Sequence, residues 1–272
     1  MVTKSKKTVA PRIGALIIGD EILSGKKEDQ HFPRLREMLG KRGLRLAWVH
    51  YAPDNRATLT ELLKRSLVSN DIVFSYGGIG NTPDDHTRQA AATALGVQLV
   101  FTDEAKKTLR LRFGDNISAQ QKLLATFPSG CSLIPNPFNN IPGFMTGTHY
   151  FLPGFPQMAH PMTKWALDSF HAKLFLEPGA IIEKSILLYG PRAYESYLLG
   201  LMQHIVDSYP ELRLFSLPGV TLQVDSRKRY LELGVEGQPP LVEAALVEIV
   251  ENIEKQGIDW RWQGKQAVSK PT

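Results

Sequence analysis

Apolar positions in the first part of the chain alternate between short continuous runs and helical repeats. Residues 13–18 form a nearly continuous apolar run, which is typical of a strand buried on both faces of a parallel sheet. Apolar residues then recur at helical spacing in 32–39, and this predicted helix ends at Gly43. A second strand is predicted at 44–51 and a second amphipathic helix at 59–67. This alternation predicts an α/β domain whose parallel sheet has right-handed connections.

A third apolar run, residues 71–74, leads into a glycine-rich turn. Glycine lets the backbone turn sharply and approach a ligand closely, and three glycines follow this strand: Gly77, Gly78 and Gly80. The first strand ends in a second polar segment that contains Gly19, Asp20 and Glu21. Ligands bind at the carboxyl ends of the strands in such sheets, so both segments are predicted to lie at the ligand site.

The residues after the glycines have the pattern of a helix N-terminus. Thr82 is the predicted N-cap, Pro83 the first helical residue, and Asp85 the residue that completes a capping box. The helix is predicted to end at Gly96. Free N–H groups and the positive end of the helix dipole would make the loop an anion site. Asp84 and Asp85 either complement that dipole or hold a cation against the anion.

Two common phosphate-binding fingerprints nearly match this sequence, and both fail. Gly78 and Gly80 lack the third glycine of the dinucleotide motif, because Pro83 stands at its position. Residues 19–26 hold one residue too many for a P-loop, and Lys27 replaces the expected hydroxyl residue. A Rossmann dehydrogenase and a P-loop nucleotidase are therefore not expected.

Beyond Gly96 the predicted elements become shorter, and two proline-containing loops appear. The predicted elements are a strand at 98–101, helices at 103–113 and 118–125, a hairpin at 144–152 that turns at Gly147, and a helix that ends at Phe170. Pro135 and Pro137 restrict the backbone of the first loop, as Pro153 and Pro156 restrict the second. Rigid loops of this kind close over a ligand at a low cost in conformational entropy.

Glu177 marks a predicted boundary, after which the pattern of elements changes. A βαββα unit is expected, with strands at 185–189, 212–217 and 229–235 and helices at 193–207 and 240–255. This order suggests comparison with the RNA-binding KH module. No Gly-x-x-Gly loop joins two helices, so we expect no nucleic-acid binding.

The composition of the chain limits the classes of protein to which it can belong. Hydrophobic content of 43% and charged content of 22% are those of an ordinary globular protein. No apolar run reaches membrane-spanning length and no signal peptide is evident, so we expect a cytoplasmic protein with no membrane partner. The single cysteine, Cys131, excludes an intrachain disulfide and is expected to be a small core residue. A net charge of +5 permits either a polyanion or a small phosphorylated ligand as partner.

Four motifs together point to a family. They are Gly-Asp-Glu-Ile-Leu-Ser-Gly at 19–25, Gly-Gly-Ile-Gly-Asn-Thr-Pro-Asp-Asp at 77–85, Leu-Ile-Pro-Asn-Pro at 133–137, and Leu-Pro-Gly-Phe-Pro at 152–156. With these motifs the chain resembles the competence/damage-inducible protein A family. The resemblance implies a three-layer molybdopterin-binding-like domain at 12–174 and a smaller α+β, KH-like domain at 177–258. We also expect a homo-oligomer.

The resemblance implies a function for the first domain. Members of the family are described as ADP-ribose pyrophosphatases, and related domains act on FAD or adenylated molybdopterin. A divalent-metal-dependent hydrolase that cleaves the pyrophosphate of ADP-ribose or a related dinucleotide is therefore expected, with Mg, Mn or Co as the cation, because carboxylates repel phosphate unless a cation lies between them. The family's C-terminal deamidase domain is expected to be absent, since the sequence ends before it.

Carried over residue by residue, the motifs assign roles. Asp85 and Glu21 are implied as catalytic residues, and Asp84, Asp85 and Asp20 as metal ligands. The implied substrate- and phosphate-binding residues are Gly19, Asp29, Gly77, Gly78, Gly80, Asn81, Thr82, Pro135, Asn136 and Pro137.

Two departures from the family pattern leave alternatives open. Asn81 stands where the family usually has proline, and His31 stands where it has asparagine. His31 either alters the polar contact to substrate or is a surface histidine, and we favour the surface histidine; the loss of the asparagine favours a binding protein without turnover. The alternatives are therefore a non-catalytic molybdopterin- or nucleotide-binding protein and a molybdopterin adenylyltransferase-like enzyme.

Overall fold

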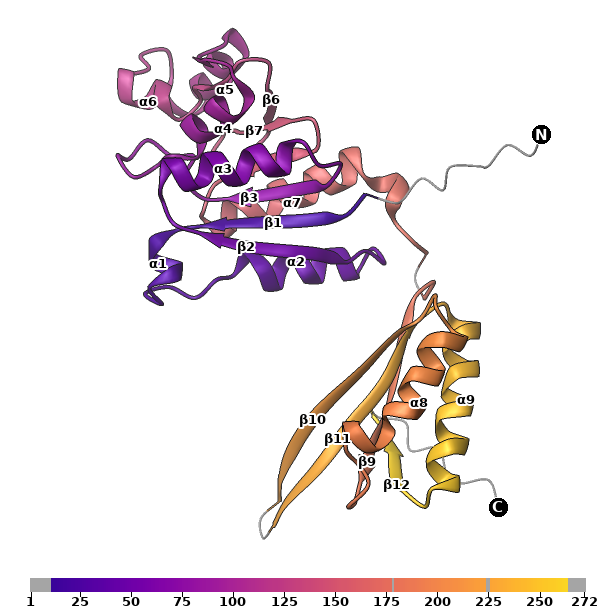
Figure 1. The fold of residues 1–272 in the computed structure, drawn as a ribbon. Helices are drawn as coiled ribbons and strands as arrows, with labels where there is room; N and C mark the ends of the chain where they lie inside the picture. Colours follow the sequence, from indigo (N-terminus) through magenta and orange to yellow (C-terminus); the bar gives the residue numbers. More distant parts are fainter. Residues whose placement is uncertain (1–10, 178, 224–225, 264–272) are drawn as a thin grey trace, which may run out of the picture. The chain divides into compact units, whose positions relative to one another are not determined.

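Two compact units make up the chain, with the division between Phe175 and Leu176. The structure is a computed structural model that describes residues 11–177, 179–223 and 226–263. Figure 1 shows the α/β unit formed by the first part of the chain and the smaller sheet-and-helix unit formed by the rest. Within the described ranges, no helix combines the length and the apolar character needed to cross a bilayer.

The first unit is built around one six-stranded sheet with the order β2-β1-β3-β8-β7-β6. Strands β2, β1, β3 and β8 run parallel, β7 pairs antiparallel with β8, and β6 pairs antiparallel with β7 and so runs in the direction of β8 again. The strands are β1 (Ile13–Ile18), β2 (Leu46–Ala52), β3 (Ile72–Tyr76), β6 (Ser132–Ile134), β7 (Gly143–Thr146) and β8 (His149–Leu152). A separate two-stranded ribbon pairs β4 (Leu99–Val100) with β5 (Phe127–Pro128).

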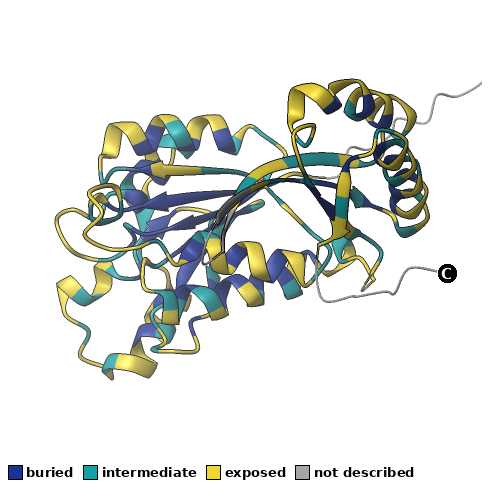
Figure 2. Cartoon of the chain, turned by 90° about the horizontal axis from the view of Figure 1, so that it is seen from below, coloured by how far each residue is buried: buried dark blue, intermediate teal, exposed yellow. Residues whose placement is uncertain are grey.

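Helices cover both faces of this sheet. They are α1 (Asp20–Leu23), α2 (His31–Gly40), α3 (Arg56–Leu67), α4 (Thr87–Leu95), α5 (Asp103–Phe113), α6 (Ala119–Leu123) and α7 (Pro156–Phe170), followed by a 3-10 turn, η1 (Ala172–Leu174). Leu35 of α2 and Met162 of α7 belong to the core on one face, and Leu63 of α3 and Leu109 of α5 to the core on the other. Figure 2 shows the buried strands between helices whose outer faces are exposed. The predicted three-layer α/β fold is confirmed.

Every residue of β1 and of β3 is buried, because neighbouring strands flank each of them and helices cover both faces. The nearly continuous apolar runs in the sequence reflect this burial. Side-chain burial fixes the register of these central strands, since a slip of one residue would exchange the two faces. Their carboxyl ends are therefore held side by side at one edge of the unit.

The second unit is a four-stranded antiparallel sheet, with the order β10-β11-β9-β12, covered by two helices. Its elements are β9 (Ile182–Tyr189), α8 (Glu195–Ser208), β10 (Arg213–Gln223), β11 (Ser226–Gly237), α9 (Pro239–Lys255) and β12 (Asp259–Trp262). Leucine, isoleucine and valine side chains from the sheet and both helices form one core, which includes Ile186, Leu201, Leu233 and Ile249.

Three details of the second unit differ from the sequence-based expectation. Strands β10 and β11 are much longer than predicted and form one extended hairpin. Pro218 concealed the continuity of β10; it is tolerated there because β10 is an edge strand with one side unpaired. Strand β12 was not predicted; Trp260 of this strand packs against the core while Asp259 is exposed.

We expect a fragment that ends at Phe175 to fold by itself. Both cores of the first unit consist of residues before Leu176, so removal of the second unit deletes no buried partner. The measurement is thermal unfolding of residues 1–175 followed by far-UV and near-UV circular dichroism. A fragment without a cooperative transition and without a near-UV signal would show that the division is wrong.

Candidate functional site

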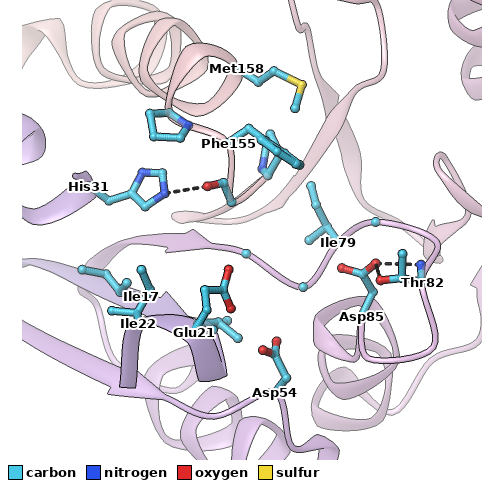
Figure 3. A pocket seen from close by; sticks show the side chains of 18 of the residues that line it. Ile17, Glu21, Ile22, His31, Asp54, Ile79, Thr82, Asp85, Phe155 and Met158 are labelled. Carbon is cyan, nitrogen blue, oxygen red and sulfur yellow. Dashed lines mark hydrogen bonds between the residues drawn. The ribbon is translucent and has the colours of Figure 1, made fainter. Parts of the chain in front are cut away.

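A cavity of about 820 Å³ lies at the carboxyl ends of β1 and β3. The loop after β3, the residues after β1, and the loops before β7 and α7 surround it (Figure 3). Ten of the residues predicted from the sequence line it: Gly19, Glu21, Gly77, Gly78, Gly80, Asn81, Thr82, Asp84, Asp85 and Asn136. The cavity therefore lies at the edge of the sheet that was expected to bind the ligand.

Four predicted residues do not line the cavity, namely Asp20, Asp29, Pro135 and Pro137. Asp29 instead caps α2: its Oδ1 accepts the N–H of His31 at 2.7 Å, and its Oδ2 accepts the N–H of Phe32 at 3.1 Å and the hydroxyl of Tyr51 at 2.8 Å. These bonds occupy the carboxylate in the protein's own structure, so Asp29 is not placed for a direct contact with a ligand in the cavity.

The two prolines flank a residue that is turned inward. Asn136 is buried, whereas Pro135 and Pro137 are exposed. The Asn136 amide donates to Asn139 Oδ1 at 2.8 Å and to the Ile141 carbonyl at 2.9 Å. Asn136 therefore holds the loop closed on itself as well as lining the cavity.

The glycine loop after β3 leaves no room for side chains at two positions. Gly77 has a φ of 104°, and a Cβ there would lie 2.4 Å from the Ile18 carbonyl oxygen. Gly78 has a φ of 67°, and a Cβ there would lie 2.3 Å from Thr87 Oγ1. Only glycine meets both demands, since it has no Cβ and adopts a positive φ readily.

The helix after this loop begins at Thr87 and not at Pro83, which corrects the sequence-based prediction. Thr82 and Asp85 make one of the two bonds of a capping box, since Thr82 N–H donates to Asp85 Oδ2 at 2.8 Å, whereas the Asp85 N–H donates to the Thr82 carbonyl and not to its hydroxyl. The chain forms a turn there, however, and His86 is the residue before the helix, without a side-chain cap. The start of α4 is set by the glycine loop, because Thr87 donates its N–H to Gly78 O and its hydroxyl to Gly77 O, both at 2.9 Å.

A buried arginine supports the same loop, and sequence reasoning missed it. Arg88 is 3% exposed and donates to the carbonyls of Gly80 at 2.5 Å, Thr126 at 3.3 Å and Leu123. Burial lowers the pKa of Arg88, while the charge of nearby Asp85 opposes this shift. A guanidinium stays charged in proteins, so Arg88 holds a positive charge beneath the loop. Its place one residue into the helix gave no sequence signal of this role.

Two carboxylates converge on one hydroxyl at the end of the loop. Thr82 Oγ1 lies 2.5 Å from Asp84 Oδ1 and 2.6 Å from Asp85 Oδ2. A hydroxyl has a single proton, so it satisfies only one of these oxygens at a time. The bond from Thr82 lowers the pKa of Asp84, which is therefore charged at neutral pH.

Asp54, at the carboxyl end of β2, completes the acidic side of the cavity and was not identified from the sequence. Burial raises the pKa of Asp54, and the charges of Asp20, Glu21 and Asp84 raise it further against a lowering bond from the Asp20 backbone. That bond joins the Asp20 N–H to Asp54 Oδ2 at 3.0 Å. Burial is the main cause of this rise in pKa, and the like charges of the three neighbouring carboxylates add to it. Asp54 follows β2 as Glu21 follows β1, so its position after a parallel strand is the sequence signal that could have identified it.

These carboxylates suit a cation that a ligand also helps to hold. Among the residues that the structure describes, no three His, Cys, Asp or Glu side chains are grouped as metal ligands. A magnesium-sized cation, however, commonly takes only one or two carboxylates and completes its shell with water and phosphate oxygens. Asp84 and Asp54 supply such carboxylates, and Figure 3 shows the Glu21 and Asp54 carboxylates facing the same space.

His31 is part of the cavity wall, which corrects its interpretation as a surface histidine. It is 5% exposed, and its ring stacks on Tyr76 with centroids 4.4 Å apart. Its Nε2–H donates to the Gly154 carbonyl at 3.1 Å, because a carbonyl accepts only. Burial lowers the pKa of His31, so the ring is neutral at neutral pH.

The side of the cavity opposite the carboxylates is apolar. Ile79, Phe155 and Met158 line it, and Figure 3 shows them across the space from Glu21 and Asp54. Phe155 stands just before α7 and is 64% exposed, although it is a large apolar side chain. An exposed ring beside an anion-binding loop offers a surface on which a planar heterocycle can stack.

Gly80 provides a test of the acidic turn. A Cβ at Gly80 would lie 2.5 Å from Asp85 Oδ2, so we expect Gly80→Ala to displace this carboxylate from Thr82. Loss of that exposed, charge-assisted bond should lower the free energy of unfolding by about 1 kcal/mol. The affinity for the ligand in the cavity should fall by about tenfold, which corresponds to a loss of about 1.4 kcal/mol in binding free energy. Urea unfolding and equilibrium binding measure the two effects, and an unchanged affinity would separate Asp85 from the site.

Comparison with known families decides the affiliation. The family described as probable molybdopterin binding domain matches residues 14–172, more than half of the chain. The chain belongs to this family. Its curated relatives include CinA-like proteins of Sulfurihydrogenibium sp., 32% identical over 56% of this chain and 40% of the relative, and of Citrifermentans bemidjiense, 35% identical over 53% of this chain and 37% of the relative. The chain thus spans less than half the length of these relatives.

A solved structure agrees with this affiliation. The crystal structure of the protein CinA, of unknown function, from Thermoplasma acidophilum is 25% identical and aligns with a TM-score of 0.53 over 59% of this chain and 97% of that one. The resemblance to the competence/damage-inducible protein A family is therefore confirmed. A molybdopterin-binding-like domain of this kind points to a nucleotide or a pterin as the class of ligand.

Proposed function

We propose that the first unit is a divalent-metal-dependent hydrolase that cleaves the pyrophosphate of ADP-ribose or a related dinucleotide. The observation that carries this proposal is that five carboxylates, among them Glu21, Asp54 and Asp84, line the cavity beside the glycine loop against a single lysine. Uncompensated carboxylates next to an anion-binding loop are unfavourable for a phosphate ligand by itself. They become favourable when a cation bridges them to that phosphate.

The residues of the chain divide the work between binding and positioning. The turn from Gly78 to Gly80 offers backbone N–H groups to the pyrophosphate, and buried Arg88 adds a positive charge beneath it. Asp84 and Asp54 would hold the cation. A bound divalent cation neutralises the phosphate oxygens and polarises the bond that is cleaved.

Either of two carboxylates can orient the attacking water. Asp85 Oδ2 accepts bonds from Thr82, and Glu21 accepts a bond from Lys27 Nζ at 3.3 Å. Each carboxylate also lines the cavity and keeps a second oxygen. The base is therefore assigned to Asp85 or Glu21, in line with the roles implied by the family motifs.

The direct test is release of AMP from ADP-ribose. The full chain is incubated with ADP-ribose and magnesium, manganese or cobalt, and parallel reactions contain EDTA. We expect AMP and ribose 5-phosphate only where a divalent cation is present. No AMP with any of the three cations, under conditions in which ADP-ribose binds, would refute the hydrolase.

A binding protein without turnover is the second candidate, because the apolar wall accounts for ring binding without a catalytic step. Phe155, Ile79 and Met158 offer a surface for a pterin or purine ring whether or not a bond is cleaved. A thermal shift with molybdopterin or nucleotides in the absence of AMP release would select this function. Consumption of ATP only when molybdopterin is present would indicate instead an adenylyltransferase.

A further inference from the structure

A second cavity, of about 480 Å³, adjoins the first between helices α2 and α7. The two cavities share the lining residues Gln30, Pro156 and Gln157. The second cavity adds Arg34 from α2 and Lys164 from α7. A ligand that leaves the first cavity beside Gln30 and Gln157 therefore comes directly to these two cations.

The two cavities have opposite charge. The charged lining of the first is five carboxylates and one lysine: Glu21, Glu28, Asp54, Asp84, Asp85 and Lys27. The lining of the second contains Arg34 and Lys164 and no carboxylate. The chemistry proposed for the first cavity does not involve these two cations.

Ion pairs around the second cavity leave the positive charge in excess. Glu37 pairs with both Arg34 and Lys41, each at 2.6 Å. Asp168 pairs with Lys164 at 2.5 Å and with Arg42 at 2.6 Å. Two carboxylates are thus shared among four cations. Side chains of Arg34 and Lys164 are 46% and 66% exposed, so both can turn toward a ligand without leaving a buried site.

His160 forms the wall between the two cavities and contributes no charge. Its ring meets the His31 ring edge to face, with centroids 5.4 Å apart, and it lines the second cavity. Burial, together with the neighbouring His31 and Arg34, lowers the pKa of His160 to about 4. At neutral pH the cations that face the second cavity are therefore Arg34 and Lys164.

We propose that this second cavity binds an additional phosphate monoester carried on a ribose of the dinucleotide. The inference rests on the proposed function, because a dinucleotide whose pyrophosphate lies in the first cavity can extend past the shared residues Gln30 and Gln157 into the second. A phosphate monoester carries a charge of about −1.5 to −2 at neutral pH and three acceptor oxygens, which an arginine and a lysine match. The favoured substrates are then dinucleotides with a 2′- or 3′-phosphate.

Two matched pairs of ligands test this subsite. ADP-ribose is compared with ADP-ribose 2′-phosphate, and dephospho-coenzyme A with coenzyme A, which carries a 3′-phosphate. Equilibrium binding to the full chain is measured with magnesium present, on analogues of the four ligands whose bridging pyrophosphate oxygen is replaced by a methylene group, so that the cation is kept and no hydrolysis interferes. We expect the phosphorylated member of at least one pair to bind about tenfold more tightly, as bonds between charged groups in a half-exposed site suggest.

Variants then assign the preference to the two cations. Arg34→Ala/Lys164→Ala should remove it and leave the affinity for the unphosphorylated member within about twofold, a difference well below 1.4 kcal/mol. The control, Arg36→Ala/Lys173→Ala, removes two exposed cations of the same unit that line neither cavity, and it should keep the preference. The melting temperature of each variant confirms that it is folded.

The outcomes separate the subsite from the hydrolase. Equal binding within both pairs, or a preference that survives in Arg34→Ala/Lys164→Ala, overturns the subsite. Binding with the expected preference but no AMP release with any cation supports the subsite and refutes only the hydrolase. If none of the four ligands binds, both proposals are wrong.

Discussion

Replacing Asp84 with asparagine is expected to leave the first unit folded and to reduce metal-dependent cleavage of ADP-ribose by about a hundredfold, the loss typical of one electrostatic element at a reacting phosphate or oxyanion. Asp84 lines the cavity, and the bond from Thr82 lowers its pKa. Asparagine keeps the acceptor for that hydroxyl but removes the charge. The measurement is kcat for AMP release across a titration of magnesium, together with the melting temperature.

A purely structural role for Asp84 predicts the reverse pattern. Loss of a cap-like bond lowers the free energy of unfolding by about 0.5–2 kcal/mol and leaves turnover unchanged. The matched control is Asp103→Asn, which removes an exposed carboxylate from the first turn of α5, remote from the cavity lining. A variant of Asp84 that melts lower yet cleaves ADP-ribose at the parental rate would falsify the metal-site reading.

Acidification from pH 6.5 to pH 4 is expected to destabilise the first unit by about 3 kcal/mol through His149 alone. His149 is 3% exposed in β8, and burial lowers its pKa to about 4, against opposing effects of Asp71 and of a bond to the Ser66 backbone. The folded state therefore holds the ring neutral, while the unfolded chain takes up a proton below its ordinary pKa of 6.5. Stability from this group is complete above pH 6.5 and falls as the pH approaches 4.

Burial lowers the pKa of three further histidines of the same unit, His31, His160 and His171, so they add to the effect in the same direction. Urea unfolding of the full chain at pH values between 4 and 7.5 measures it. His149→Gln should flatten the profile, whereas His50→Gln, at an exposed position of β2, should leave it unchanged. A profile for His149→Gln as steep as that of the parent would contradict the assignment.

The elements that the sequence predicted well are those whose burial is uniform along their length. Strand β1 coincides with its apolar run, and α5 has the predicted bounds, 103–113, because Thr102 caps it and Gly114 follows it. The start of α4 was wrong because a complete capping pattern at Thr82 forms a turn. The bonds from Thr87 to the glycine loop decide where the helix begins, and no local pattern reveals them.

The same distinction applies to the candidate site. The glycine loop and the carboxylates after β1 and β3 follow from local sequence and sheet topology, and they were predicted, whereas Asp54 after β2 was missed. Asp29 and His31 could not be placed, because their roles depend on partners distant in the sequence. His31 reaches the carbonyl of Gly154, 123 positions away, and Asp29 reaches Tyr51 across the sheet edge. At such positions the sequence identifies the type of side chain, but it does not show whether that side chain faces the cavity or the protein's own interior.

The His31 imidazole also acts as a spacer. It is held between Tyr76 of β3 and the carbonyl of Gly154, so the loop before α7 stays a full ring away from the sheet. The related family usually has the shorter asparagine at this place, which would either draw the loop inward or leave the carbonyl unpaired. The distance between this loop and the sheet is therefore set by one aromatic ring, and a smaller side chain at position 31 is expected either to narrow the cavity or to leave the Gly154 carbonyl without this bond.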